Sequence, residues 1–237
     1  MHNIDYSIVC CFYNEIQILK KKFDKFLKEI KNSPFSYEIL ICDNNSDDGT
    51  YEFLKEIESR SLKNFKFIFN SSNLGKGGSI KKCVSSSRGK YIAIYDMDEY
   101  AYNDLIVADS ILKKNHHIDF LVGSRLLTGK NIIYKRNYYG LRFMSYLINL
   151  LFKTNIKDAA AATKFFKKEI YDNLKIVTNE FDFEFDLLCK YAIKKQNIAE
   201  FPIQYFPRTF EEGKKLRAFK DGSMILKTIL KNFITRK

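Results

Sequence analysis

The chain has 237 residues, 46% of them hydrophobic and 15% aromatic, which suits one large folded domain and excludes a disordered protein. Its 40 Lys and Arg against 28 Asp and Glu give a net charge of +12, which favours an anionic partner, although no nucleic-acid-binding motif accompanies it. No apolar run approaches the ~20 residues that span a bilayer, and no signal-peptide core is present, so we expect a cytoplasmic protein, peripheral at most.

The first hundred residues alternate between strand-like and helix-like segments. Short apolar runs predict strands over residues 6–11, 37–42, 65–70 and 91–95. The segments between them predict helices that run from after Glu15 to about residue 30, from near Thr50 onwards, and from about residue 75 to 87. This alternation predicts an α/β fold with a mainly parallel central sheet and helices on both faces.

The second half is less regular. We expect a strand over residues 119–122, helices over 138–152 and 181–192, and an edge strand over 199–206 that Pro202 interrupts. A final helix closes the chain. We therefore predict a single domain over residues 1–222 and a C-terminal helix over 223–237, with no transmembrane segment.

The five cysteines lack the paired spacings of zinc sites. Four of them lie inside or beside apolar runs, which is typical of small buried hydrophobic residues in a reducing compartment. The five are Cys10, Cys11, Cys42, Cys83 and Cys189.

Two carboxylates follow the strand predicted over residues 91–95. Asp96 and Asp98 are separated by one residue, so both project to the same side if the chain stays extended. A Mg²⁺ or Mn²⁺ ion that carries a diphosphate suits them, because such ions take one or two carboxylates and complete their shell with phosphate oxygens. For an isolated D-x-D, a solvated strand end is the competing interpretation.

Polar clusters also follow the earlier strands, and the ends of parallel strands meet at one edge of a sheet. Glu15 and Asp43 suit hydrogen bonds to a base or ribose. Lys76, in a glycine-rich turn over residues 75–78, is a weaker phosphate-binding candidate, and the turn lacks the P-loop spacing of ATPases. Ordinary turn chemistry would explain each cluster alone, but their joint occurrence favours a ligand site.

Together these motifs resemble the family 2 inverting glycosyltransferases, and within them the dolichol-phosphate mannosyltransferase and polyprenyl-phosphate glycosyltransferase branch. The resemblance extends from Ser7 to about Gly222. It rests on Tyr13-Asn14-Glu15, residues 43–50, residues 73–77, Asp96-Met97-Asp98, Gly123-Ser124-Arg125, residues 183–188, residues 200–203 and Arg208.

The resemblance implies a GT-A type nucleotide-sugar-binding fold and a metal-dependent hexosyltransferase. Asp96 and Asp98 would bind Mg²⁺ or Mn²⁺. Asp98, Arg125 and Arg208 would be catalytic, with the two arginines near the donor diphosphate or the acceptor phosphate, and Arg136 would contact the acceptor phosphate. Guanidinium suits these roles because it grips phosphate through two hydrogen bonds, although a surface ion pair would explain any one of these arginines alone. The residues expected to bind the nucleotide sugar are Tyr13, Glu15, Asp43, Lys76 and Asp96.

Three segments depart from the pattern of the branch. Residues 211–215 replace the S-K that commonly follows the closing arginine. Tyr100 stands where the branch commonly has a glutamine. The usual D-x-x-x-G-F-K becomes Asp158 to Lys164, with Ala162 and Thr163 in place of Gly and Phe. In relatives this segment borders the sugar and the acceptor, so the identity of the substrate stays open.

The implied reaction moves a sugar from a GDP- or UDP-sugar to a polyprenyl phosphate at the cytoplasmic membrane face. A lipid phosphate is already ionised near neutral pH and needs no strong base, whereas an alcohol acceptor does. Glu184 and Asp186 are candidate bases, but they are equally explained as solvated helix residues.

The apolar, aromatic helix over residues 138–152 suits an interfacial helix on an anionic membrane. A buried core helix with polar ends is the alternative. Its basic flanks are Lys135, Arg136, Arg142 and Lys153. Two further functions stay open, namely sugar transfer to a glycan hydroxyl in surface polysaccharide synthesis, and a non-catalytic nucleotide-sugar-binding module.

Overall fold

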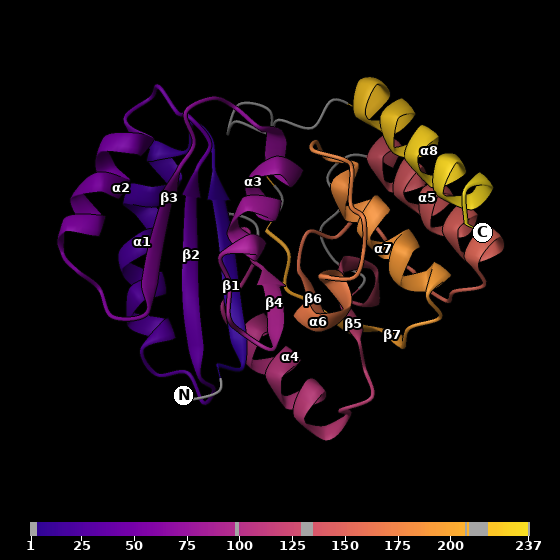
Figure 1. The fold of residues 1–237 in the computed structure, drawn as a ribbon, viewed down its shortest axis with the longest axis horizontal. Coiled ribbons are helices and arrows are strands. Elements are labelled where there is room, and N and C mark those ends of the chain that lie inside the picture. The colour runs from indigo at the N-terminus through magenta and orange to yellow at the C-terminus, as the bar shows by residue number, and fades with distance from the viewer. Residues whose placement is uncertain (1–3, 98–99, 129–134, 207, 209–217, 237) are drawn as a thin grey trace.

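The computed structural model describes residues 4–97, 100–128, 135–206, 208 and 218–236, without the side chains of residues 135–137 and 218–219. Its centre is a seven-stranded sheet in the order β3-β2-β1-β4-β6-β5-β7 (Figure 1). The strands are β1 (Tyr6–Phe12), β2 (Tyr37–Asp43), β3 (Phe65–Phe69), β4 (Tyr91–Ile94), β5 (Phe120–Ser124), β6 (Lys164–Lys167) and β7 (Ile198–Pro202).

Helices cover both faces of the sheet, as the sequence predicted. One face packs against α1 (Ile16–Ile30), α2 (Thr50–Ser59) and α4 (Asn103–Lys114). The other packs against α3 (Gly75–Ser85) and α7 (Phe183–Ile193), with α5 (Lys135–Phe152) and α8 (Ala218–Ile234) completing that layer (Figure 1). The short elements η1 (Arg125–Leu127) and α6 (Lys168–Tyr171) follow β5 and β6.

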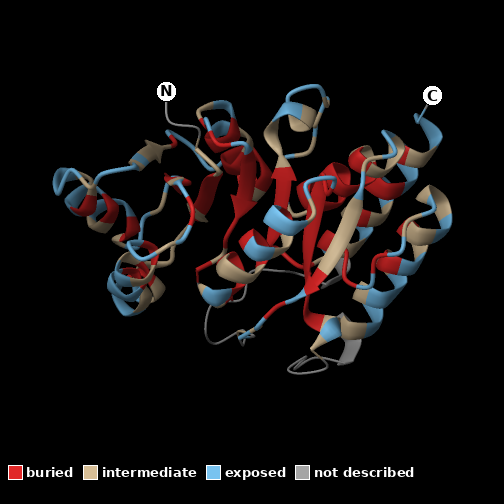
Figure 2. Cartoon of the chain, turned by 90° about the horizontal axis from the view of Figure 1, so that it is seen from below, coloured by how far each residue is buried: buried red, intermediate tan, exposed pale blue. Residues whose placement is uncertain are grey.

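The central strands are buried on both faces, which explains their nearly continuous apolar sequences. In β1, Ile8 and Cys10 point into the core under α1, whereas Val9 points into the core under α3. The edge strands β3 and β7 are only partly buried (Figure 2). Within the described ranges, no helix combines the length and the apolar character that crossing a membrane requires.

Strand β6 is the one element of the sheet that runs against the others, and the sequence did not predict it. It pairs antiparallel with both β4 and β5, while the other strand pairs are parallel. The carboxyl ends of the parallel strands therefore share an edge with the amino end of β6. Lys164, the first residue of β6, pairs there with Ile94 and Val122.

Other boundaries differ modestly from those predicted. Strand β7 ends at Pro202, because proline cannot donate to a ladder. Helix α8 begins at Ala218, five residues before the predicted start at residue 223. The strand predicted over residues 119–122 is β5, and it continues to Ser124.

The glycine-rich turn brings α3 into close contact with the start of α7. A Cβ atom at Gly77 would lie 2.4 Å from Phe183 Cβ, and one at Gly75 would lie 2.4 Å from the carbonyl oxygen of Asn179. Gly75 also has a φ of +75°, and the Gly78 amide donates to the Asn179 carbonyl at 2.9 Å. These glycines therefore serve close packing between segments about a hundred residues apart.

Gly77→Ala tests this contact. We expect it to lower the free energy of unfolding by roughly 1–3 kcal/mol, because a methyl group must displace the Phe183 side chain and backbone. Gly222→Ala in α8 is the matched control, since a Cβ there meets nothing within 4 Å, and it should stabilise by about 0.5–1 kcal/mol. Urea unfolding followed by circular dichroism measures both, and equal effects would contradict the packing role.

Candidate functional site

The loops after β1 and β2 are tied together at the carboxyl edge of the sheet. The Asn14 amide N–H donates to Ser46 Oγ at 2.9 Å, and its side-chain Nδ2 donates to Asp47 Oδ1 at 2.8 Å. The Asp47 amide returns a bond to Asn14 Oδ1 at 3.0 Å. Asn14 has a φ of 52°, a left-handed conformation that asparagine tolerates well.

A second asparagine ties in the loop after β3. Asn44 Nδ2 donates to Asn73 Oδ1 at 2.8 Å, and Asn44 Oδ1 accepts from the Leu74 amide at 2.9 Å. Asn70 Nδ2 donates to the same Asn44 oxygen at 3.0 Å. The polar clusters that the sequence predicted at one edge thus form a single braced surface. The bracing role of Asn14 and Asn44 was not predicted from the sequence.

Asp43 is buried at the centre of this surface. One of its carboxylate oxygens accepts hydrogen bonds, and the other has no donor among the described residues. Its Oδ2 accepts from the backbone amides of Asn45 and Ser46 at 3.1 and 3.2 Å. Its Oδ1 is buried and has no hydrogen-bond partner within the described part of the chain. A buried carboxylate oxygen without a donor is costly, so this atom points to a ligand N–H or O–H.

Glu15 and Arg208, two predicted site residues, form a bidentate ion pair. Arg208 Nη1 and Nη2 donate to Glu15 Oε1 and Oε2 at 3.1 and 2.9 Å. Both side chains are only 12–13% exposed. This pair fastens the segment after β7 to the start of α1. Tyr13, beside Asn14, is half-buried at the same place.

Four alternating charges form a chain from the end of β4 into the interior. Lys76 Nζ lies 2.7 Å from Asp96 Oδ2 and 2.9 Å from Glu184 Oε1. The second oxygen of Glu184 lies 3.1 Å from Nζ of Lys164, whose side chain is fully buried and also donates to the Ala161 carbonyl. The contact between α3 and α7 brings Lys76 to Glu184, and the reversed strand β6 supplies Lys164.

These contacts decide the ionisation of the acid that faces the site. Burial alone would raise the pKa of Glu184, but the ammonium groups of Lys164 and Lys76 more than offset it and hold the pKa below its ordinary value. Burial likewise opposes the charge on Lys76, but Asp96 and Glu184 raise its pKa well above normal. Glu184 is therefore a fixed anion between two cations and a poor general base.

Asp186, the other candidate base, faces away from this edge. Its Oδ1 accepts from Asn232 Nδ2 of α8 at 2.9 Å, and its Oδ2 accepts from the Thr178 hydroxyl at 3.1 Å. The side chain is 1% exposed. Two residues along a helix correspond to about 200°, so Glu184 and Asp186 lie on opposite sides of α7. Asp186 joins α7 to α8, and neither acid is a solvated helix residue.

Arg125 forms an ion pair with Asp158, which lies on the loop before β6. Its Nε and Nη2 donate to Asp158 Oδ2 and Oδ1 at 2.8 and 2.7 Å, and its amide donates to Oδ2 at 3.0 Å. Its guanidinium carbon lies 5.1 Å from the centre of the Tyr205 ring. The pair is almost completely buried, so Arg125 joins β5 to the segment before β6.

Two of the three departures from the branch pattern touch each other, and the third, at residues 211–215, lies outside the described residues. The Ala162 amide donates to the Tyr100 hydroxyl oxygen at 3.2 Å, and the Tyr100 ring lies 5.6 Å from that of Tyr205. Tyr100 is 3% exposed and Ala162 is 6% exposed. The two positions are therefore in contact, and Arg125 packs against Tyr205 beside them.

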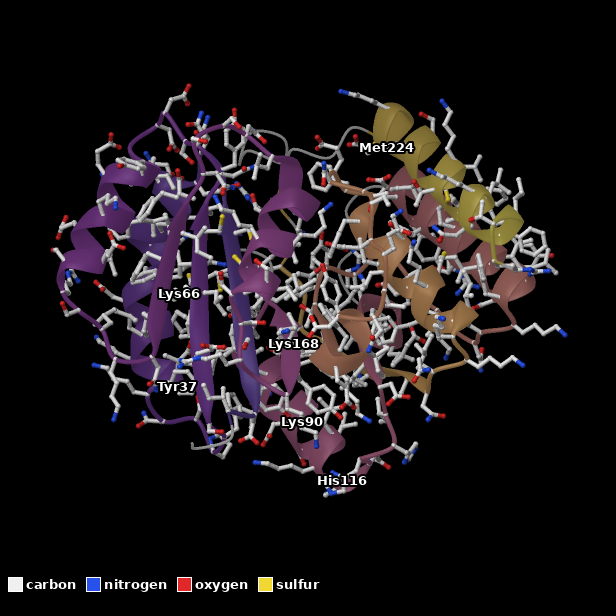
Figure 3. The ribbon with its side chains drawn as sticks, in the orientation of Figure 1. Tyr37, Lys66, Lys90, His116, Lys168 and Met224 are labelled. Carbon is white, nitrogen blue, oxygen red and sulfur yellow. The ribbon has the colours of Figure 1, made fainter. Side chains whose placement is uncertain are left out.

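Asp96 has the chemistry of a site for a hard cation. Its carboxylate is 18% exposed and already faces a positive charge, that of Lys76. Two other predicted contributions cannot be located, because Asp98 and the side chain of Arg136 lie outside the described residues. The opposite edge of the sheet, where the strands begin, carries Tyr37, Lys90 and His116 (Figure 3).

Comparison with known proteins identifies relatives of this chain. The model of the Glycosyl transferase family 2 matches residues 7–175. The dolichyl-phosphate beta-glucosyltransferase of Dictyostelium discoideum is 29% identical over 247 residues, covering 97% of this chain and 74% of that protein. An uncharacterised glycosyltransferase of Methanocaldococcus jannaschii is 27% identical over 204 residues, covering 79% and 69%.

Solved structures share the fold. Glucosyl-3-phosphoglycerate synthase from Mycobacterium tuberculosis, crystallised with Mn²⁺, UDP and phosphoglyceric acid, aligns with a TM-score of 0.71 at 15% identity, covering 97% of this chain and 78% of that chain. S. aureus TarS in complex with UDP-GlcNAc aligns with a TM-score of 0.62 at 14% identity, covering 98% and 67%. The fold is therefore of the GT-A type, as expected. Since the family match runs through most of the chain and takes in all three braced loops, this chain belongs to glycosyl transferase family 2.

Proposed function

We propose that this enzyme transfers a hexose, with inversion, from a UDP-sugar to a polyprenyl phosphate at the cytoplasmic face of a membrane. The observation that carries the proposal is an exposed apolar stripe on α5, which offers a surface for a lipid-borne acceptor. The relative from Dictyostelium discoideum, a dolichyl-phosphate beta-glucosyltransferase, supports the same acceptor class and favours glucose as the sugar.

The stripe occupies one side of α5. Tyr139, Phe143, Tyr146 and Leu150 are 68%, 52%, 62% and 62% exposed. Their spacing of four, three and four residues places them on one helical face. A helix that served only as core would bury such a face. The alternative of a buried core helix therefore explains Ile148, which is fully buried, but not the stripe.

Basic residues accompany the stripe, as an anionic membrane surface requires. Arg142 and Lys153 are exposed on α5 and just after it, and Lys231 is exposed on the adjacent helix α8. Each basic residue near an anionic leaflet contributes about 1 kcal/mol of attraction. Ile234, near the end of α8, is a further exposed apolar residue, at 74%. The protein would therefore bind the membrane peripherally through α5 and the end of α8.

The donor base is inferred from the open oxygen of Asp43. Uracil presents one imide N–H, which matches one vacant buried acceptor, whereas the edge of guanine presents donors on two nitrogens. Structural neighbours crystallised with UDP or UDP-GlcNAc support the choice of UDP over GDP. Tyr13 and the pair of Glu15 with Arg208 would border the nucleoside.

Asp96 and Asp98 would hold a Mg²⁺ or Mn²⁺ ion, and Lys76 would contact the diphosphate beside it. A divalent ion in this position supplies charge neutralisation for the leaving nucleoside diphosphate. The neighbour crystallised with Mn²⁺ supports a divalent ion. Lys76 already bridges Asp96 and Glu184, so its ammonium group can turn to phosphate without losing its anchor on Glu184.

The state of the acids supports a phosphate acceptor over an alcohol. Glu184 is held as an ion pair and Asp186 faces α8, so neither is suited to remove a proton from an alcohol. A lipid monophosphate carries its negative charge to the site and attacks without a strong base. Arg136, in the first turn of α5, would meet that phosphate where the stripe begins.

The decisive assay measures nucleoside diphosphate release from UDP-glucose, UDP-GlcNAc and GDP-mannose, with Mn²⁺ and with or without polyprenyl phosphate. We expect release from a UDP-sugar to be stimulated by the lipid phosphate, with formation of a lipid-linked sugar. Release that responds only to a glycan acceptor would replace the lipid acceptor by a hydroxyl acceptor. Inactivity with every donor and acceptor would favour a non-catalytic binding module.

Asp98→Ala tests the metal assignment. We expect turnover to fall by about 100-fold or more, because a ligand to the charge-neutralising ion is lost, while the melting temperature stays close to that of the wild type. Asp24→Ala is the control, since Asp24 is exposed on α1, remote from the site. Turnover that is unchanged in Asp98→Ala at limiting Mn²⁺ would remove Asp98 from the metal site.

Phe143→Asp combined with Leu150→Asp tests the membrane surface. We expect loss of flotation with phosphatidylserine vesicles at physiological salt and a higher KM for the lipid acceptor, with UDP binding unchanged. Tyr51→Asp, which places the same charge on an exposed residue of α2, should float like the wild type. Wild-type protein that does not float, or a double variant that changes only the oligomeric state, would assign the stripe to contact between copies of the chain.

A further inference from the structure

Three cysteines from three separate elements come together beside the braced loops. Cys11 of β1 and Cys42 of β2 are register partners on neighbouring strands, and Cys83 lies above them on α3. The three Sγ atoms all lie within 4.8 Å of one another. Cys10, by contrast, points into the core on the other face of the sheet.

We propose that Cys11, Cys42 and Cys83 form a binding site for a soft divalent cation of the zinc class, distinct from the magnesium or manganese ion expected at Asp96. Because the site consists of thiols on β1, β2 and α3, the proposal does not depend on the donor, the acceptor or the reaction.

The geometry needs little adjustment to hold an ion. Zinc–sulfur bonds of about 2.3 Å at tetrahedral angles separate the sulfur atoms by about 3.8 Å. The three Sγ atoms are already within 4.8 Å of one another, and each sits on a regular strand or helix. Three protein ligands leave a fourth position for water. Of the three residues, Cys11 is partly buried and the other two are buried.

Of the three cysteines, only Cys42 is favoured as thiolate. Hydrogen bonds with the neighbouring thiols and burial raise the pKa of Cys11 well above its ordinary value. The hydrogen bond of Cys83 with Cys11 lowers the pKa of Cys83, but its hydrogen bond with Cys42 and burial outweigh this effect, so that this pKa is raised as well. Hydrogen bonds from the thiols of Cys11 and Cys83 lower the pKa of Cys42, and the Ser79 hydroxyl and the charge of Lys82 act in the same direction. Asn70 Nδ2 lies 3.5 Å from Cys42 Sγ.

A cationic side chain is connected to this cluster through an amide. Lys82 Nζ donates to Asn70 Oδ1 at 2.9 Å, so the amide that faces Cys42 is polarised by an ammonium group. On binding, each thiol still protonated releases its proton to solvent and its sulfur donates a lone pair to the ion. Three thiolates and one divalent cation leave a single negative charge, which Lys82 is placed to offset.

The donor set separates this site from the one at Asp96. Thiolate sulfur selects soft or borderline ions such as Zn²⁺ and Cd²⁺, whereas carboxylate oxygens suit Mg²⁺ and Mn²⁺. Cys42 directly precedes Asp43, and Cys11 lies two residues before Tyr13. An ion held by the three cysteines would join β1, β2 and α3 directly under the braced loops.

The test titrates Cd²⁺ into the full chain after purification under reducing conditions and removal of metal with a chelator. Cadmium–thiolate bonds give an ultraviolet charge-transfer absorption, which we expect to saturate at one equivalent and to resist excess Mn²⁺. Cys11→Ala, Cys42→Ala and Cys83→Ala should each lose that absorption. Cys10→Ala, on the opposite face of the same strand, should retain it.

A second measurement, of the melting temperature, distinguishes loss of metal binding from poor folding of a variant. Zn²⁺ should raise the melting temperature of the wild type and of Cys10→Ala but not of Cys11→Ala, which removes one of the three ligands. Wild-type protein without the absorption at one equivalent of Cd²⁺, or a Cys83→Ala variant that keeps it, would overturn the proposal. Neither measurement uses a sugar donor, so both can fail while the proposed transferase activity holds.

Discussion

The buried charge chain of Asp96, Lys76, Glu184 and Lys164 is the constraint on which the rest of the site depends. It joins the end of β4, the first turns of α3 and α7 and the start of β6, and each inner charge contacts a charge of opposite sign on both sides. Removing one partner from such a chain leaves a buried charge uncompensated, which is strongly destabilising. The close approach of α3 to α7 at Gly77 is therefore needed as much for electrostatics as for packing.

The sequence predicted the parts of the site that are local. The strands before Tyr13, Asp43 and Asp96 are predicted by apolar runs that end at polar loops. Because these strands are parallel, the loops meet at one edge of the sheet. The sequence could not predict β6, because it is four residues long and begins with a buried lysine, Lys164. It also could not predict the pairing of Arg125 with Asp158, since no local pattern encodes a contact between residues 33 positions apart.

Charged residues in the second half of the chain also have roles that their local sequence does not predict. The sequence around Glu184 and Asp186 does not distinguish these two acids. Their different roles depend on which elements pack on either side of α7. The unusual residues Tyr100 and Ala162 look like independent departures in the sequence, but a hydrogen bond joins them in the fold. Family patterns thus located both positions, and the structure shows that they are in contact.

The reversed direction of β6 sets the segment before it apart from the loops at the carboxyl ends of the parallel strands. The segment from Asp158 to Thr163 enters β6 at the edge where those strands end, and it is bound to its neighbours there. The Gly123 amide donates to the Thr163 carbonyl at 2.9 Å, and Asp158 holds Arg125. A change in the length or sequence of this segment must therefore be accommodated by β5 and by Arg125, whereas the three braced loops lie on other strands.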